Sequence, residues 1–269
     1  MSKRKALGQH FLVNRSAILK IVDAVDPQPD ELVIEIGAGK GALTFLLAER
    51  AGRVIAIERD AAFIPFLREK SPANVSILEA DVLAVDFSDL AASEPSYRGR
   101  IKLCGNLPYS ISSPLLFKVL DDRAHFVSCV FLLQKEVAER VTSVEGSKDY
   151  APMSILLRTY FEPRIRLRLS PHSFSPPPRV DSALVSLVRR KNPLFEIRDE
   201  SAFRAFLRAA FGQRRKTLAN NLKAAGYDLS RALAALDRLG FGRRVRAEEI
   251  EPGRLVELQG LIKRGDSLS

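Results

Sequence analysis

The feature that most constrains the fold is an alternation of short apolar runs with helix-like segments through the front part of the chain. Apolar runs at residues 32–36, 53–57 and 75–78 predict buried strands, and helices are expected between them. Strands that alternate with helices indicate a parallel sheet. Such sheets bind ligands at the carboxyl ends of their strands, so the residues that follow each run are the first candidates for a site.

A glycine-rich turn at residues 37–41 follows the first run and precedes a helix expected at residues 42–50. Glycines at such a turn let the backbone approach a nucleotide-like ligand, and the amides of the helix start face it. Glu58 follows the second run, where its carboxylate can accept hydrogen bonds from both ribose hydroxyls. Asp81 follows the third run, within reach of an adenine edge.

The glycine pattern alone does not choose the ligand. Gly37, Gly39 and Ala42 fit the dinucleotide spacing G-x-G-x-x-A, and Glu58 lies 21 residues past Gly37, where NAD enzymes also have an acid. S-adenosylmethionine presents the same adenosine without a pyrophosphate. Both cofactors stay open at this point, beside a purely structural turn.

The stretch Asn106-Leu107-Pro108-Tyr109 follows another apolar run, at a glycine where the chain is expected to leave the sheet. An adenine amino group has two N–H donors, so a site that holds it needs two acceptors and a flat surface. The Asn106 side-chain oxygen and the Leu107 carbonyl supply the acceptors, and Pro108 restricts that carbonyl. Tyr109 can stack on the base. An ordinary strand-exit turn has the same composition, so the context has to decide.

The net charge of +10 is unevenly distributed. Residues 1–150 carry 19 Lys and Arg against 20 Asp and Glu, whereas residues 151–269 carry 23 against 12. This asymmetry predicts a catalytic core joined to a surface that binds a polyanion, with charge for solubility as the plainer alternative.

The composition describes a globular protein, with 46% hydrophobic and 28% charged residues. No apolar run approaches about 18 residues and no signal-peptide core is present, so a cytosolic protein without a membrane anchor is expected. Cys104 and Cys129 lie in strand-like runs, which predicts buried free thiols. The three histidines are scattered, and no metal site is expected.

Two features of the back half concern arginine and proline. Residues 164–169 alternate arginine with aliphatic residues, which predicts a strand with Arg164, Arg166 and Arg168 on one face. Residues 170–179 are too rich in proline for helix or sheet and predict a stiff extended loop. This loop either displays Phe174 as a second stacking surface or tucks its ring into the core.

After a boundary at residues 189–193 the chain is expected to be helical, at 201–211, 214–225, 230–239 and 252–264. Arg214, Arg215 and Lys216 would open the second of these helices, where cations oppose the helix dipole. Because the helix dipole repels cations at this end of a helix, the basic triplet is predicted to bind an external anion such as a phosphate backbone.

Five motifs carry a resemblance to the bacterial small-subunit ribosomal RNA adenine dimethyltransferases. In chain order they are Gly8-Gln9-His10-Phe11-Leu12, residues 35–44 (EIGAGKGALT), residues 106–109 (NLPY), residues 174–182 (FSPPPRVDS) and residues 211–218 (FGQRRKTL). The resemblance covers nearly the whole chain. It favours S-adenosylmethionine over NAD, because a dehydrogenase needs no clamp for an adenine amine.

The resemblance implies a class I S-adenosylmethionine-dependent methyltransferase. Its expected fold is Rossmann-like α/β, with a seven-stranded, mostly parallel sheet whose last strand is antiparallel, and a small all-helical C-terminal domain. Residues 1–192 would form the methyltransferase domain with its basic N-terminal arm, and residues 193–269 a helical RNA-binding domain. The implied reaction transfers methyl groups to N6 of two adjacent adenosines in a hairpin near the 3′ end of small-subunit ribosomal RNA. A monomer acting on the small ribosomal subunit during ribosome biogenesis is expected.

The family's functional residues carry over motif by motif. The implied cofactor contacts are Gln9, His10, Leu12, Gly37, Gly39, Glu58, Asp81 and Asn106. The target base would lie on Asn106, Leu107, Tyr109 and Phe174, and the RNA on Arg214, Arg215 and Lys216. His10 departs from the family pattern, in which asparagine is frequent at that place.

Two other functions share part of this pattern. A non-catalytic ribosome-assembly factor would keep the basic back half without needing the Asn106 clamp, which is intact here. A large-subunit RNA methyltransferase of the macrolide-resistance type shares the core and the clamp but differs in its C-terminal helices. Residues 214–218 favour the small-subunit family.

Overall fold

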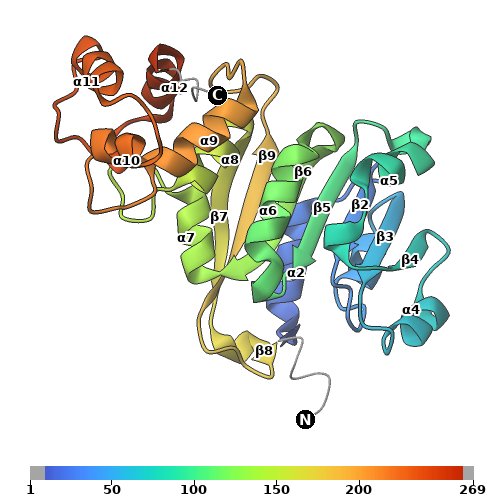
Figure 1. Ribbon diagram of the computed structural model, residues 1–269. Coiled ribbons are helices and arrows are strands. Elements are labelled where there is room, and N and C mark those ends of the chain that lie inside the picture. The colour runs from blue at the N-terminus through green and yellow to red at the C-terminus, as the bar shows by residue number, and fades with distance from the viewer. Residues whose placement is uncertain (1–9, 263–269) are drawn as a thin grey trace. The chain divides into compact units, whose positions relative to one another are not determined.

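The computed structural model describes residues 10–262 (Figure 1). Contacts divide the chain into two compact units. The first comprises the chain up to Glu139 together with Tyr160–Lys191, and the second comprises Arg140–Thr159 and the chain from Asn192 onward. The second unit therefore includes a segment that the sequence assigns to the methyltransferase domain.

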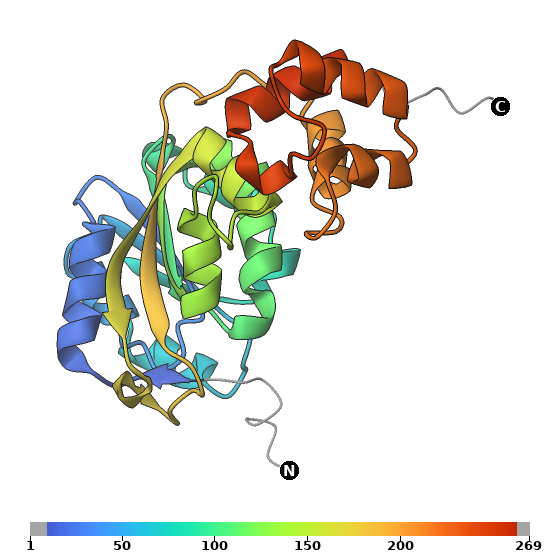
Figure 2. The same ribbon diagram turned by 90° about the vertical axis from the view of Figure 1, so that its left-hand side faces the viewer.

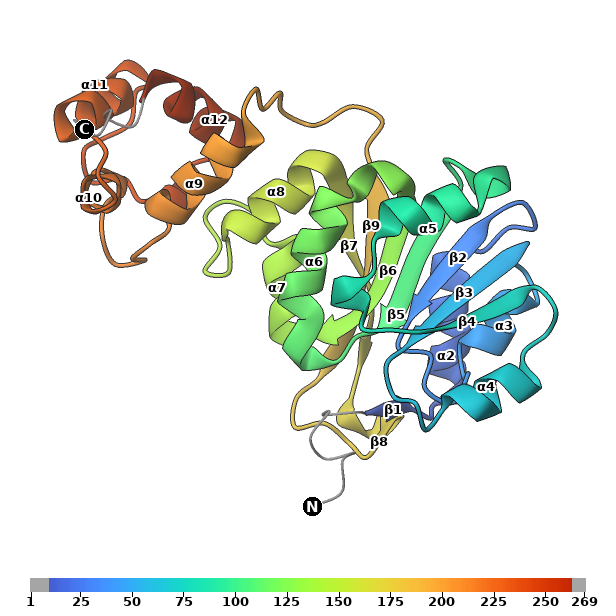
Figure 3. The same cartoon turned by 45° about the vertical axis from the view of Figure 1, so that its right-hand side comes forward.

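The first unit is built on a seven-stranded sheet (Figure 3). Its strands are β2 (Leu32–Ile36), β3 (Arg53–Glu58), β4 (Val75–Glu79), β5 (Ile101–Asn106), β6 (Phe126–Gln134), β7 (Phe161–Leu169) and β9 (Ser182–Arg189). They lie in the order β4-β3-β2-β5-β6-β9-β7. Strands β2 to β6 pair in parallel, whereas β9 is antiparallel to both β6 and β7. The predicted parallel sheet with an antiparallel last strand is confirmed.

Helices connect these strands close to the predicted places. They are α2 (Arg15–Val25), α3 (Thr44–Ala48), α4 (Ile64–Lys70), α5 (Phe87–Ser93) and α6 (Ser112–Asp121), followed by α7 (Lys135–Thr142). Asn14 is the N-cap of α2, because its side chain accepts a hydrogen bond from the Ala17 N–H (3.0 Å).

The sheet forms a middle layer with helices on both faces. Figure 2 shows the blue helix α2 on one face and green helices on the other. α2 packs against β6, β9 and α3, and its residues Ile21 and Val22 share a buried cluster with Val33, Leu47 and Leu184. Because both faces are covered, all five residues of β2 are buried, and the apolar run at residues 32–36 has no polar alternation.

Strand β5 continues past the glycine at which it was expected to end. Gly105 pairs with Ile36 of β2, and Asn106 is the last residue of the strand. A Cβ at Gly105 would lie 2.4 Å from the Ile36 carbonyl oxygen. The glycine is therefore required by close approach of two strands and does not mark an exit from the sheet.

The three arginines of β7 do not share one face, contrary to the prediction. The register shifts between Ile165 and Leu167, so that Arg164 lies opposite Ser186 and Arg168 opposite Ala183. Ser186 and Ala183 are three residues apart on β9, which places their partners on opposite faces of the sheet. The bulge adds one residue, and regular alternation in the sequence does not reveal it.

The proline-rich stretch 170–179 contains short regular structure, although none was expected. β1 (Phe11–Leu12) and β8 (Phe174–Ser175) form a separate antiparallel pair, with Leu12 opposite Phe174. Phe174 is 4% exposed and belongs to the same buried cluster as α2. Of the two predicted positions for this ring, the buried one is found, because the N-terminal strand supplies the pairing that proline cannot provide within the loop.

The second unit is helical. It contains most of α8 (Pro152–Tyr160) together with α9 (Glu200–Ala210), α10 (Leu218–Ala224), α11 (Leu229–Arg238) and α12 (Pro252–Leu261). Each of the last four helices packs on the next, and α12 contacts α9 again. The four predicted C-terminal helices are therefore confirmed. α9 and α11 each begin and end one residue before the predicted bounds, α10 begins four residues later than predicted, and α12 ends at Leu261.

The basic triplet does not open a helix, contrary to expectation. α10 begins at Leu218, and Thr217 caps it by accepting a hydrogen bond from the Asn220 N–H (3.3 Å). Arg214, Arg215 and Lys216 are exposed in the turn before this cap. The Thr217 hydroxyl sets the start of α10 as its N-cap. The prediction began this helix at residue 214 because arginine and lysine are also good helix formers.

Candidate active site

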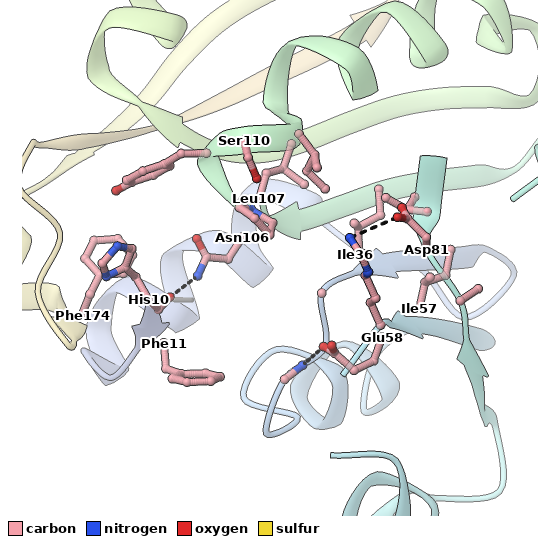
Figure 4. Close-up of a pocket in the computed structure, with 18 residues that line it drawn as sticks. His10, Phe11, Ile36, Ile57, Glu58, Asp81, Asn106, Leu107, Ser110 and Phe174 are labelled. Atoms are coloured by element: carbon pink, nitrogen blue, oxygen red, sulfur yellow. Dashed lines mark hydrogen bonds and ion pairs between the residues drawn. The ribbon is translucent and has the colours of Figure 1, made fainter. Parts of the chain in front are cut away.

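One cavity at the carboxyl edge of the parallel strands brings together most of the predicted site residues (Figure 4). The predicted residues in its lining are His10, Gly37, Gly39, Glu58, Asp81, Asn106, Leu107, Tyr109 and Phe174. Leu12 lines an adjoining cavity that also touches the glycine turn. Gln9 lies outside the described residues.

Glu58 organises the glycine turn. Its side chain is 5% exposed, and its two carboxylate oxygens accept hydrogen bonds from the Gly39 and Asp60 N–H groups, both at 2.7 Å. Gly37 and Gly39 have positive φ values of 76° and 55°, which side chains rarely adopt. Each carboxylate oxygen retains a lone pair that can accept from a hydroxyl in the cavity.

Asp81 lies across the cavity at the end of β4. One carboxylate oxygen accepts from the Leu83 N–H (3.0 Å), and the other lies 3.2 Å from an Arg59 guanidinium nitrogen. These contacts fix the carboxylate at the cavity edge. An amine donor can still reach its remaining lone pairs.

Glu35 is a feature of the site that the sequence reasoning missed. It is 1% exposed at the base of the glycine turn, lines the adjoining cavity, and accepts a hydrogen bond from the Thr44 hydroxyl (2.5 Å). Burial raises the pKa of Glu35 to about 7; the Thr44 hydrogen bond opposes this shift, and the charge of Glu58 adds to it. The available signal was a single acid within an otherwise apolar run.

The buried carboxyls fit a cationic adenosine cofactor better than a dinucleotide. A pyrophosphate at the glycine turn would place its negative charges beside the Glu58 carboxylate and would further oppose ionisation of Glu35. A sulfonium and an ammonium group gain from the same neighbours. S-adenosylmethionine carries both cations, and its ribose hydroxyls and adenine amine are donors that suit Glu58 and Asp81.

Asn106 has a fixed amide orientation. Its side-chain nitrogen donates a hydrogen bond to the His10 carbonyl (2.9 Å), so its oxygen points the other way, as Figure 4 shows. The Leu107 N–H donates to the Leu132 carbonyl (3.3 Å), which extends the β5–β6 pairing into this stretch. The turn is thus held from both sides by segments distant in sequence.

Aromatic rings border the same end of the cavity. The His10 and Tyr109 rings lie 5.6 Å apart between centroids at an angle of 33°, and the His10 Nδ1 is 2.8 Å from the Pro176 carbonyl oxygen. Phe11, which was not among the predicted site residues, lines both cavities and packs edge-on against Phe63. Its place in the first motif was the available signal.

The basic triplet has a second basic loop beside it in the C-terminal unit. The Leu218 N–H donates to the Val245 carbonyl (2.9 Å), which places residues 242–246 next to the turn that precedes α10. Arg243, Arg244 and Arg246 are exposed on this loop. The Arg214 guanidinium donates to the Lys148 carbonyl, which ties the polar loop 145–150 into the same unit.

Neither a metal site nor a membrane-spanning helix is found among the described residues. Among residues 10–262, no group of three or more His, Cys, Asp or Glu is arranged to hold a metal ion. None of the described helices is long and apolar enough to cross a membrane.

Comparison with known proteins decides the family. The family model of ribosomal RNA adenine dimethylases matches residues 1–257. The chain belongs to this family. Among relatives named ribosomal RNA small subunit methyltransferase A, that of Geobacter metallireducens is 44% identical over 84% of this chain and 82% of its own length. That of Xanthomonas euvesicatoria is 46% identical over 81% of this chain and 82% of its own length.

Solved structures agree with this family assignment. A dimethyladenosine transferase from Plasmodium falciparum aligns with a TM-score of 0.80 at 26% identity and covers 94% of this chain and 99% of its own. The 23S rRNA methyltransferase ErmE aligns with a TM-score of 0.70, at the same identity and coverage. The predicted family and the class I methyltransferase fold are confirmed. As a member of the ribosomal RNA adenine dimethylase family, the protein is an S-adenosylmethionine-dependent enzyme that dimethylates adenine in ribosomal RNA.

Proposed function

We propose that the RNA substrate is the small-subunit ribosomal RNA and that the two methylated adenosines are adjacent, in a hairpin near its 3′ end. Support comes from relatives at 44% and 46% identity whose names specify the small subunit. The main observation in support of the proposed reaction is the orientation of the Asn106 amide. Its nitrogen is committed to the His10 carbonyl, and its oxygen is directed away from that contact as an acceptor for a base amine.

The cofactor lies along the glycine turn in this proposal. Glu58 accepts hydrogen bonds from the ribose hydroxyls, Asp81 accepts from the adenine amine, and Gly37 and Gly39 allow close approach. Leu12 and His10, from the N-terminal strand and the residue before it, close the other side, and Gln9 stays a predicted contact outside the described residues. S-adenosylmethionine supplies the methyl group as a good leaving-group sulfonium, so the protein needs little acid–base chemistry.

The target adenine lies on the other half of the pocket. Its amine is a poor nucleophile because the nitrogen lone pair is delocalised into the ring. Acceptors at the Asn106 oxygen and the Leu107 carbonyl favour the pyramidal amine and aim it at the methyl group. Stacking on Tyr109, with Phe174 at the pocket wall, offsets part of the few kcal/mol that unstacking a base costs.

The RNA backbone lies on the C-terminal unit in this proposal. Arg214, Arg215 and Lys216 contact phosphates, and the neighbouring loop at residues 242–246 extends the basic surface. Residues 193–269 then act as the RNA-binding domain and residues 1–192 as the methyltransferase domain. The protein works in the cytoplasm as a monomer on the small ribosomal subunit.

A second candidate function follows from the similarity to ErmE, whose name assigns it to 23S rRNA. Labelled cofactor is incubated with unmethylated small subunits and, in parallel, with large subunits, and the modified nucleoside is identified by mass spectrometry. Dimethyladenosine in the small subunit supports the proposal. Transfer to the large subunit alone would favour the ErmE-like function, and transfer to neither would favour an assembly factor.

A further inference from the structure

Ser182 is a buried hydroxyl beside the pocket that the proposed function does not use. It is the first residue of β9 and is 2% exposed. Because β9 runs antiparallel to β6, its first residue lies at the carboxyl edge of the parallel strands. Ser182 pairs there with Gln134 of β6 on one side and Leu169 of β7 on the other. Its backbone is therefore among the most firmly held at this edge.

The Ser182 hydroxyl faces Tyr109. Its Oγ lies 3.3 Å from the Tyr109 hydroxyl oxygen, and either group can donate. Tyr109 itself begins a short 3-10 turn, Tyr109–Ile111, and is only partly buried. The contact therefore joins the far end of a ring on an irregular turn to a strand inside the sheet.

A second contact acts on the same ring. The His10 ring lies 5.6 Å from the Tyr109 ring, and the His10 carbonyl holds the Asn106 amide. His10 thus links the ring to the acceptor, and Ser182 links the ring to the sheet. The Ser182 contact holds the hydroxyl end of the Tyr109 ring, and the His10 ring borders the side of it, so both contacts restrict where the ring lies relative to the Asn106 oxygen.

We infer that Ser182 is a positioning residue for methyl transfer, which acts by holding the Tyr109 ring at the angle on which the target adenine stacks. The inference rests on the proposed function, because it assumes that the base stacks on Tyr109. Its physical basis is that transfer requires the amine to lie in line with the methyl group. A tilt of the stacking surface moves the amine away from its acceptors.

The inference predicts coupling between the two hydroxyls. Ser182→Ala and Tyr109→Phe each remove the same hydrogen bond but keep an aromatic ring at position 109. Each is expected to lower the single-turnover methyl transfer rate, at saturating cofactor and RNA, by roughly two- to tenfold. The double variant is expected to be no slower than the slower single variant, because the same interaction cannot be removed twice.

A matched control separates positioning from general stability. Ser186 is 6% exposed on the same strand, four residues further along, and does not line the pocket. Ser186→Ala is expected to leave the rate unchanged. Cofactor affinity, measured by calorimetry, is expected to be the same in all variants, since the Ser182–Tyr109 hydrogen bond lies on the base side of the pocket.

Two results would overturn the inference. One is a double variant whose rate loss equals the product of the single losses, because independent effects mean that Ser182 acts elsewhere. The other is a Ser182→Ala enzyme with the wild-type rate. Both are judged on wild-type protein that methylates small subunits. If wild-type protein transfers nothing to small subunits, the proposed function has failed. A failure of the Ser182 inference alone is distinguished from this, because the wild-type protein is then active.

Discussion

In the proposed cofactor half of the pocket the carboxylates of Glu58 and Asp81 have hydrogen-bond partners within the protein, whereas in the proposed base half no partner of the Asn106 side-chain oxygen is found among residues 10–262. Glu58 accepts from two backbone N–H groups and Asp81 from one, with Arg59 beside it. For Asn106, the hydrogen bond found within residues 10–262 uses the side-chain nitrogen. The cofactor half is therefore held in shape before any ligand binds.

The two halves also differ in how far apart their parts lie in the sequence. In the proposed cofactor half, Gly37, Glu58 and Asp81 lie at or just after the ends of β2, β3 and β4, and His10 and Leu12 come from the N-terminal segment. The base half joins His10, Asn106, Phe174 and Ser182 through contacts that span much of the first unit. The part of the proposed cofactor half at the strand ends is local along the chain, whereas the half proposed to take the base is assembled from distant segments.

The largest effect is expected in the proposed base half, on the rate of methyl transfer. Asn106→Ala should fold, bind RNA, and transfer methyl groups about a hundredfold to a thousandfold more slowly, because it removes an oriented acceptor worth on the order of 3–4 kcal/mol. Single-turnover rates at saturating cofactor test this. Cofactor affinity is measured separately, since Asn106 also borders the glycine turn. A near-normal saturated rate would mean that the turn is structural.

The next effect concerns the buried acid beneath the glycine turn. The raised pKa of Glu35, about 7 against an ordinary 4.5, means that the folded protein binds more protons than the unfolded chain between these values. Wild-type stability therefore falls as pH rises through this window, by on the order of 3 kcal/mol, and levels off above it.

Glu35→Gln removes this titration. The variant should gain stability relative to wild type as pH rises from 4.5 to about 8, measured by urea unfolding of both proteins at each pH. Glutamine keeps a carbonyl oxygen for the Thr44 hydroxyl, so the packing is matched. Parallel stability curves for the two proteins would show that the pKa of Glu35 is the same in the folded and unfolded states, and would contradict the prediction.

In the proposed cofactor half, a substitution is expected to change the affinity for the cofactor. Glu58→Ala should weaken binding of S-adenosylmethionine by roughly 1.5–3 kcal/mol, because it removes the charged acceptor for the ribose hydroxyls. Calorimetric titration measures the loss. The variant also frees the Gly39 and Asp60 N–H groups, so thermal unfolding of the free protein is the control. Equal affinities of variant and wild type would contradict the assignment.

The smallest effect is expected outside the pocket, at exposed basic residues whose charge is screened by salt. Neutralising Arg214, Arg215 and Lys216 together should weaken RNA binding modestly and flatten its dependence on salt, by about 0.7–0.9 in log–log slope for each phosphate that the protein no longer neutralises. Filter binding over a range of salt concentrations measures the slope. Cofactor affinity should be unchanged. A wild-type slope in the triple variant would identify these residues as solvated charge.

The sequence by itself determined the parts of the molecule in which neighbours along the chain are also neighbours in space. Apolar runs predicted β2, β3 and β4, and the position after each run predicted Glu58 and Asp81 at one edge of the sheet. The motif order predicted the family, because five separate stretches had to match together. Local chemistry was enough for these inferences, since a parallel sheet places the ends of its strands side by side.

Only the tertiary structure decided the contacts that join distant segments or break a local pattern. Pairing of β1 with β8 buried Phe174, and the bulge in β7 turned Arg164 and Arg168 to opposite faces. The Ser182 hydroxyl came to lie against Tyr109 because an antiparallel strand begins where the parallel strands end. Spacing along the chain carries no information on such contacts, because they depend on which strands become neighbours and in which register.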